Sequence, residues 1–138
     1  MLLQVGWSLF AGLLATLAML LVTHLLDGSG AEVVHLAEVL GAKVWRGNAG
    51  PVVSYGLHVL LGTALGGVYG TVLYPLLPGP VPLRGLLFGV GLWLLLMVVV
   101  LPLAQEGLFA RRRGGHTALM TLIGHMVYGG FLGVIFRL

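Results

Sequence analysis

The chain has 138 residues, of which 59% are hydrophobic and 8% are charged, with a formal net charge of +3. Soluble domains carry charge on about 25% of their residues, so this composition excludes an ordinary soluble domain and favours a membrane protein. The absence of cysteine excludes a disulfide framework, thiolate catalysis and cysteine-ligated clusters. Because one crossing takes about 20 apolar residues, we expect residues 1–138 to form a single all-α domain with four membrane spans.

The first span is predicted over about residues 2–26, a stretch without a formal charge. A secretory signal would start with basic residues and would have a shorter apolar run, so we interpret this segment as a transmembrane helix.

The connection after it, residues 27–50, indicates a short helix of its own. Ser29 and Glu32 have the spacing of a capping box, which favours a helix start. Apolar residues then recur at helical intervals, at Val33, Leu36, Ala37, Leu40 and Val44. We expect an interfacial helix over about 30–45 that lies in the membrane surface, with Trp45 as its anchor.

Three further charge-free stretches predict spans over about 51–77, 86–105 and 116–136. Pro-Gly-Pro at residues 78–80 forces a tight connection, so the second and third helices are expected to be antiparallel neighbours. Pro75 and Pro102 lie near span ends, where a mild kink is the expected cost.

Basic residues divide unequally between the two sides of a four-span chain. Arg84 and Arg137 share the side of the termini, and the opposite side carries Lys43, Arg46, Arg111, Arg112 and Arg113. Short cytoplasmic loops are enriched in lysine and arginine, which predicts that the 27–50 and 106–115 loops are cytoplasmic. We assign the triplet Arg111, Arg112 and Arg113 to topology or to anionic lipid, at about 1 kcal/mol each, and expect no nucleic-acid partner.

The second and fourth spans share the pattern H-x-x-x-G-x-x-x-G, which starts at His58 and again at His125. The first and third spans match more loosely, so the chain is predicted to be a four-helix bundle made from a duplicated helical hairpin. Small residues let helices approach closely in lipid, and the second and fourth helices are expected to meet through them. The predicted packing residues are Gly62, Gly66, Gly70, Gly129 and Gly133.

His58 and His125 are the candidate functional residues, because an ionisable side chain inside a span is costly. Measured along their helices from the same side, they lie about 10 and about 13 Å deep. In the preferred interpretation, both are neutral and hydrogen-bond across helices as packing groups. The hydroxyl partners considered are Ser54, Thr63, Thr117 and Thr121. The alternatives are a pair that ligates haem b axially, and a proton or quinone site.

Other chemistry is sparse. The acidic residues are Asp27, Glu32, Glu38 and Glu106, and none lies in a predicted span. Glu32 and His35 have the spacing of half a di-iron site, but the other half is missing, so no metal site is predicted. The sequence contains no nucleophilic triad and no phosphate-binding loop, so no catalytic residue is assigned and a non-enzymatic role is expected.

Two stretches carry a resemblance to a known family. They are Leu83-Arg84-Gly85-Leu86-Leu87-Phe88-Gly89, followed by Trp93, Met97 and Pro102, and Gly124-His125-Met126-Val127-Tyr128-Gly129. With these stretches the chain resembles a family of small, uncharacterised bacterial membrane proteins with four helices. The resemblance implies a four-helix fold and a bacterial inner-membrane location, and it supplies no catalytic residues.

The chain is rich in association motifs and poor in chemistry. We therefore expect a structural role in the lipid bilayer, as an accessory or assembly subunit that packs through its glycine-rich faces against a larger membrane complex or another copy. The alternative is a small haem- or ligand-binding redox bundle that uses His58 and His125. A transporter is disfavoured, because four short spans without a charged pathway offer little to line a route.

Overall fold

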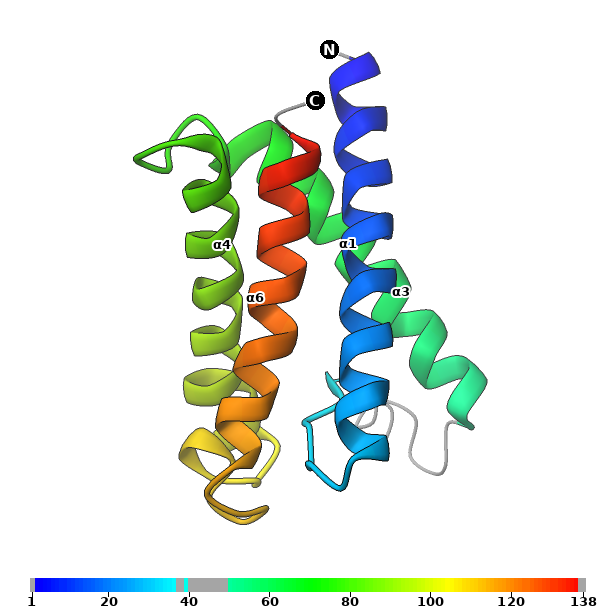
Figure 1. The fold of residues 1–138 in the computed structure, drawn as a ribbon, viewed down its shortest axis with the longest axis vertical. Helices are drawn as coiled ribbons and strands as arrows, with labels where there is room; N and C mark the ends of the chain where they lie inside the picture. The colour runs from blue at the N-terminus through cyan, green and yellow to red at the C-terminus, as the bar shows by residue number, and fades with distance from the viewer. Residues whose placement is uncertain (1, 37–38, 40–49, 137–138) are drawn as a thin grey trace.

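The structure is a computed structural model that describes residues 2–36, 39 and 50–136. This described part contains helices, turns and loops, and no strand (Figure 1). In chain order the elements are α1 (Leu2–Gly28), α3 (Pro51–Val68), the π-helical turn η1 (Tyr69–Leu73), α4 (Val81–Leu95), the π-helical turn η2 (Leu96–Val100), α5 (Leu101–Leu103), the 3-10 turn η3 (Leu108–Ala110) and α6 (Thr117–Ile135).

In the described ranges, four helices are long and apolar enough to cross a membrane: Leu2–Gly28, Pro51–Leu73, Val81–Leu103 and Thr117–Ile135. This is the pattern of a multi-pass membrane protein, and it confirms the predicted all-α fold with four spans. The third helix begins at Val81 rather than near residue 86. Its early start is possible because Pro80 is the cap and Pro82 lies in the first turn, where a missing N–H costs no hydrogen bond.

Two of the long helices widen into a π-helical turn just before a proline. The turn η1 ends at Leu73, before Pro75, and η2 ends at Val100, before Pro102. A proline cannot donate to the carbonyl four residues earlier and its ring collides with that carbonyl, so a wider turn relieves the conflict. The expected kinks near the span ends therefore take the form of local π turns.

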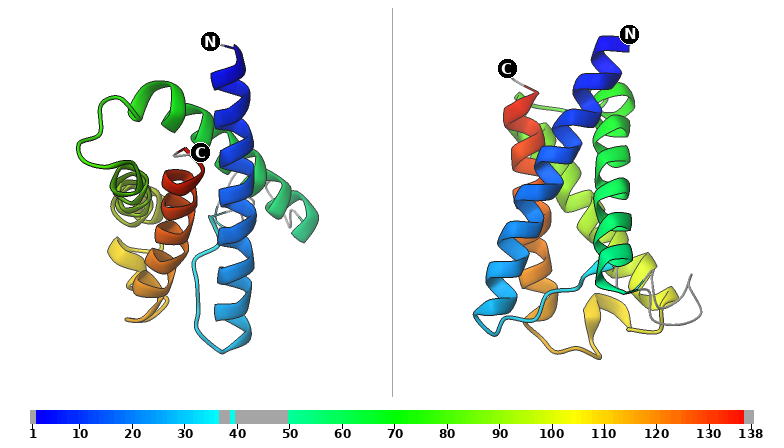
Figure 2. Two further views of the ribbon diagram at one scale, coloured as in Figure 1. Left: turned by 45° about the horizontal axis from the view of Figure 1, so that its top comes forward. Right: turned by 90° about the vertical axis from the view of Figure 1, so that its right-hand side faces the viewer.

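The four long helices pack in the order α3, α1, α6, α4 (Figures 1 and 2). Close packing joins α1 to α3, α1 to α6 and α4 to α6. The prediction that the second and third helices are antiparallel neighbours is wrong, because α3 crosses behind α1 and diverges from α4 (Figure 1). The Pro-Gly-Pro turn joins only their adjoining ends, while contacts with α1 and α6 determine the direction of each helix.

Glycines make the closest approaches between helices. In the first hairpin, a Cβ on Gly12 of α1 would lie 2.8 Å from the Cα of Gly66 in α3. In the second hairpin, Gly85 of α4 and Gly129 of α6 lie so close that a Cβ on either would overlap the carbonyl oxygen of the other. Such contacts are available only to residues without a side chain.

The predicted packing glycines all lie inside the bundle, but they pack mainly within each hairpin rather than between the second and fourth helices as expected. Gly62, Gly66 and Gly70 pack against α1, and Gly129 and Gly133 pack against α4. Gly70 also lies against the ring of Phe136 at the end of α6. Each hairpin is therefore closed by the glycines of its own second helix. The same arrangement occurs twice, as a duplicated hairpin would produce.

The segment after α1 is not helical where the sequence pattern predicts a helix. Residues 31–35 have no regular secondary structure, while Leu36 and Val39 are helical. The start of the predicted interfacial helix over 30–45 is therefore wrong. The rest of that helix, with Trp45, lies outside the described residues apart from Leu36 and Val39.

Side chains from elsewhere explain the extended start of this segment. Val33 and Val34 are both 3% exposed, and because successive side chains of an extended segment point to opposite sides, the segment is covered on both sides. The Asp27 carboxylate accepts the Val33 N–H at 3.2 Å, and the Thr121 hydroxyl accepts the Val34 N–H at 3.0 Å. These acceptors replace the helical carbonyls. In place of a capping box, the Ser29 hydroxyl donates to the carbonyl of α1 three residues earlier.

Candidate functional site

A cavity of about 280 Å³ lies between α3 and α4, with α1 and α6 behind it. The described residues that line it are Thr16, Met19, Val34, Leu36, His58, Leu61, Gly62, Leu65, Leu92, Leu95, Leu96, Val100, His125 and Tyr128. Most are aliphatic, and none of these described residues is an acid, a lysine or an arginine. The cavity is therefore an apolar space with a few polar groups on its wall.

The cavity lies where α3 and α4 separate. Its two rims, α3 and α4, diverge and make no extended contact with each other. Leu95 on the α4 rim is 53% exposed. Val34 and Leu36 of the connection after α1 also line the cavity.

His125 projects from α6 into this cavity and is only 8% exposed. Its Nδ1 lies 2.9 Å from the carbonyl oxygen of Thr121, one turn earlier in the same helix. A carbonyl can only accept, so Nδ1 carries the proton and Nε2 of the neutral ring keeps a lone pair. The expected bond to a hydroxyl on another helix is not formed, because the nearer backbone carbonyl satisfies this nitrogen.

His58 lines the same cavity from α3 and is half-buried. His125 and His35 both lie within electrostatic reach of it. The structure therefore brings the two predicted candidate residues together on one wall, from helices that belong to different hairpins. Two other described histidines, His24 and His116, are exposed on the outer surface and do not line the cavity.

Tyr128 is a cavity residue that sequence reasoning treated only as part of a family resemblance. Its hydroxyl donates a 2.6 Å hydrogen bond to the carbonyl oxygen of Gly62, which ties α6 to α3 across the back of the cavity. Tyr128 follows His125 by three residues, and residues at that spacing share a helix face. This spacing is the feature of the sequence that could have indicated Tyr128 as a neighbour of His125 on the same helix face.

The cavity fits haem poorly. Two histidines could supply axial ligands to the haem iron. However, the cavity volume of about 280 Å³ is slightly below about 300 Å³, the smallest volume typical of sites that enclose drug-sized ligands. The described wall also offers no arginine or lysine to pair with the propionates of haem. Among the described residues, no three histidine, aspartate or glutamate side chains gather to hold a metal ion.

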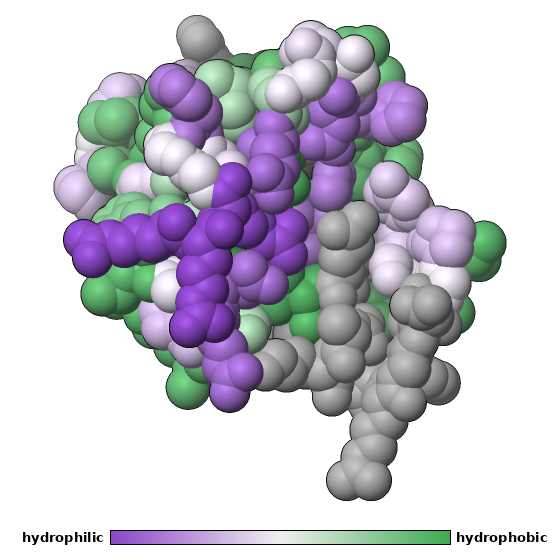
Figure 3. Space-filling model, turned by 90° about the horizontal axis from the view of Figure 1, so that it is seen from below, coloured by the Kyte–Doolittle hydropathy of each residue, from purple (hydrophilic) through white to green (hydrophobic). Residues whose placement is uncertain are grey.

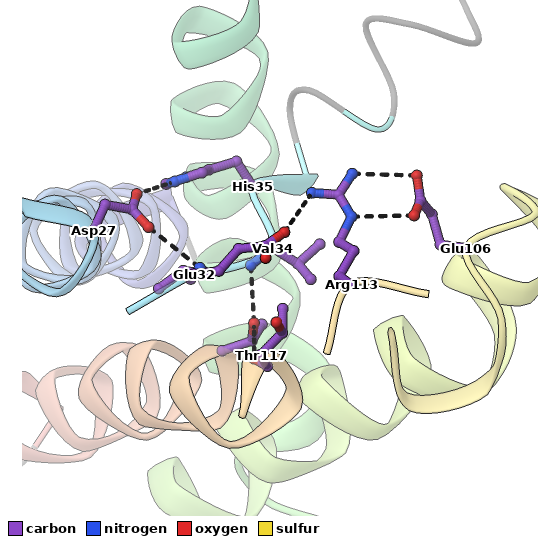
Figure 4. Close-up of polar contacts among 9 residues, drawn as sticks. Asp27, Glu32, Val34, His35, Glu106, Arg113 and Thr117 are labelled. Carbon is purple, nitrogen blue, oxygen red and sulfur yellow. Dashed lines mark hydrogen bonds and ion pairs between the residues drawn. The ribbon is translucent and has the colours of Figure 1, made fainter. Parts of the chain in front are cut away.

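A polar network fastens the connection after α1 beneath the cavity (Figure 4). Arg113 donates from Nε and Nη2 to the two carboxylate oxygens of Glu106, at 3.1 and 3.2 Å, and its Nη1 lies 3.8 Å from Glu32. The His35 ring donates to Asp27. Glu32 and His35 are thus members of a polar network at this end of the bundle.

Polar side chains gather at this end of the molecule, as the view from below shows (Figure 3). Arg111 and Arg112 are exposed there, while Arg113 takes part in the network just described. Lys43, Arg46 and Arg137, which also entered the topology prediction, lie outside the described residues. At the opposite end, Arg84 donates to the carbonyl oxygens of Gly79 and Tyr74 and so holds the Pro-Gly-Pro turn.

Comparison with known proteins identifies the family and nothing more specific. No curated protein and no solved structure matches the chain. A family model described as a family of unknown function, DUF6789, matches residues 3–138. This match covers nearly the whole chain and agrees with the resemblance to an uncharacterised family, so the protein belongs to the DUF6789 family.

Proposed function

We propose that the protein is a ligand-binding membrane protein that holds an uncharged, lipophilic molecule between its helices. The observation that carries this proposal is the cavity, whose wall is built from all four spans and contains both intramembrane histidines. Ligand sites are commonly apolar hollows with a few convergent polar groups, and this cavity has that composition. His58 and His125 would recognise the polar group of the ligand, and the leucines would surround its apolar body.

The role of an accessory or assembly subunit rested on glycine-rich faces available to a partner. The glycines concerned are occupied by contacts within the bundle, so they do not support that role. A membrane-protein partner or a second copy therefore stays a prediction without further support.

Filling the cavity tests the proposal. Leu61→Trp places an indole on the cavity wall, and Leu60→Trp places the same group at the same depth on the exposed face of α3. Solvent extracts of the purified proteins are compared by mass spectrometry. We expect a lipophilic compound to co-purify with the wild type and with Leu60→Trp, and to be depleted at least tenfold in Leu61→Trp.

Equal extracts from all three proteins would contradict ligand binding in the cavity. The same preparations also examine the haem alternative through their absorption spectra. A Soret band that disappears when His58 or His125 is replaced by leucine would assign the cavity to haem and displace the proposal.

We further propose that the protein lies in the bacterial inner membrane with its 27–50 and 106–115 loops in the cytoplasm. The exposed Arg111 and Arg112 support this orientation, because basic loops are retained on the cytoplasmic side. The native chain has no cysteine, so single introduced cysteines report position without background.

In intact cells, a membrane-impermeant maleimide is expected to label Pro78→Cys, at the Pro-Gly-Pro turn, but not Ser29→Cys. Both positions are exposed, so access alone decides the result. Ser29→Cys should be labelled after the cells are permeabilised. The opposite pattern would reverse the orientation.

A further inference from the structure

The polar side-chain atoms on the cavity wall have more free hydrogen-bond acceptors than free donors. The Thr16 hydroxyl donates to the Gly12 carbonyl at 2.7 Å, and the Tyr128 hydroxyl donates to the Gly62 carbonyl at 2.6 Å. A hydroxyl has only one proton to donate, so both oxygens retain only acceptor lone pairs. Among the described lining residues, the hydroxyl groups therefore have no free donor.

His125 extends the same imbalance. Its single proton is on Nδ1 and is donated to the Thr121 carbonyl, which leaves Nε2 as an acceptor. No hydrogen bond joins Nε2 to the described residues. The backbone N–H groups of the helices are used in helical hydrogen bonds, and the Val34 N–H is used by Thr121. Among the described side chains of the wall, His58 is thus the one with a donor to offer.

We propose that the cavity selects a lipophilic molecule that carries a hydroxyl group, and that this hydroxyl donates to Nε2 of His125. This inference rests on the proposed ligand-binding function and specifies its ligand class. A hydroxyl supplies the donor that Nε2 of His125 lacks and can accept in return from His58. A ligand with only carbonyl or ether oxygens would leave Nε2 unpaired in an apolar space, and an unpaired buried polar group is costly.

The charge and size of the site restrict the ligand further. The described lining contains no acid, lysine or arginine, and a charge at this depth in a bilayer is expensive, so the ligand is neutral. About 280 Å³ accommodates a hydroxylated ring or the head of a long-chain alcohol. We expect a longer tail to pass between α3 and α4, which are not closely packed together, into the lipid. A ring alcohol such as a quinol and a long-chain alcohol share this chemistry.

Matched probes separate hydroxyl recognition from simple apolar binding. The probes are 4-hexylphenol, its methyl ether 4-hexylanisole, 4-hexylacetophenone and 1-decanol, titrated calorimetrically into the wild-type protein in detergent. Heats measured with Leu61→Trp, whose cavity is filled, are subtracted as the micelle background. We expect 4-hexylphenol to bind about tenfold more tightly than 4-hexylanisole, the value of one buried hydrogen bond. Comparison with 1-decanol then shows whether the ring or the chain is preferred.

A histidine variant identifies the acceptor. In His125→Leu, the affinity for 4-hexylphenol should fall to that for the ether, while the affinity for the ether is unchanged. His24→Leu, at an exposed histidine, should keep the tenfold difference. The comparison of probes on the wild type does not use His125→Leu, so the proposal is tested even if this variant does not fold.

The outcomes distinguish this inference from the function on which it rests. Equal affinities for phenol and ether, or tighter binding of the ketone, would overturn hydroxyl selection and leave ligand binding intact. Failure of every probe to bind more tightly to the wild type than to Leu61→Trp would overturn both.

Discussion

Leucine in place of Gly66 is expected to prevent α1 and α3 from packing, and to lower the free energy of unfolding by about 3 kcal/mol or more. A Cβ at this position would overlap the Cα of Gly12 and would lie 2.8 Å from the Gly12 nitrogen and 2.9 Å from the Ser8 carbonyl oxygen. These are backbone atoms of α1, which cannot rotate aside as a side chain can. The measurement is unfolding of the purified protein in mixed micelles with increasing denaturing detergent.

Gly56→Leu is the matched control on the same helix. A Cβ on Gly56 would meet no atom within 4 Å, so this leucine should change the free energy of unfolding by no more than about 0.5 kcal/mol. Because the two variants differ only in register along α3, the contrast isolates the approach of the helices. Equal effects of the two substitutions would show that the Gly12–Gly66 contact does not hold the hairpin together.

The spans could be predicted from the sequence because the requirement for about 20 apolar residues is local. Each stretch without charge became one helix, and the π turns before Pro75 and Pro102 follow from the chemistry of proline alone. The same local reasoning failed for the partners of the helices. A spaced glycine pattern indicates which residues approach another helix closely, but it carries no information about which helix is approached.

The connection after α1 shows a second limit of local patterns. Its capping residues and apolar spacing favour a helix, but residues 31–35 are held extended by Asp27 and by Thr121, which lies 87 residues after Val34. A side chain so distant in sequence cannot enter a periodicity argument. Burial of both Val33 and Val34 against the bundle then outweighs the helical preference.

For the candidate site, matching depths indicated that His58 and His125 could act together, and the structure brings both to one cavity. The cavity itself was not predictable, because it exists only where α3 and α4 diverge, and that divergence follows from contacts with α1 and α6. The tautomer of His125 depends in turn on the backbone carbonyl of Thr121. The sequence indicated Thr121 as a partner only through its side-chain hydroxyl.

Replacement of Thr121 by valine should detach the connection after α1 from α6. The buried Thr121 hydroxyl accepts the Val34 N–H at 3.0 Å, and valine has the same shape without an acceptor. An unpaired buried N–H costs about 1–3 kcal/mol, so we expect a loss of stability in that range. Because Val34 and Leu36 line the cavity, the variant should also weaken ligand retention. Hydrogen exchange followed by mass spectrometry should show faster exchange in residues 31–36.

Thr71→Val separates this effect from the loss of a threonine hydroxyl as such. The Thr71 and Thr121 hydroxyls each donate at 2.7 Å to the carbonyl four residues earlier in their own helix, on Gly67 and Thr117. Of the two, only Thr121 also accepts a bond from the connection after α1. Exchange in residues 31–36 should therefore be unchanged in Thr71→Val. If Thr121→Val also left it unchanged, burial of Val33 and Val34 would be sufficient to hold the segment, and the hydrogen bond would only select its register.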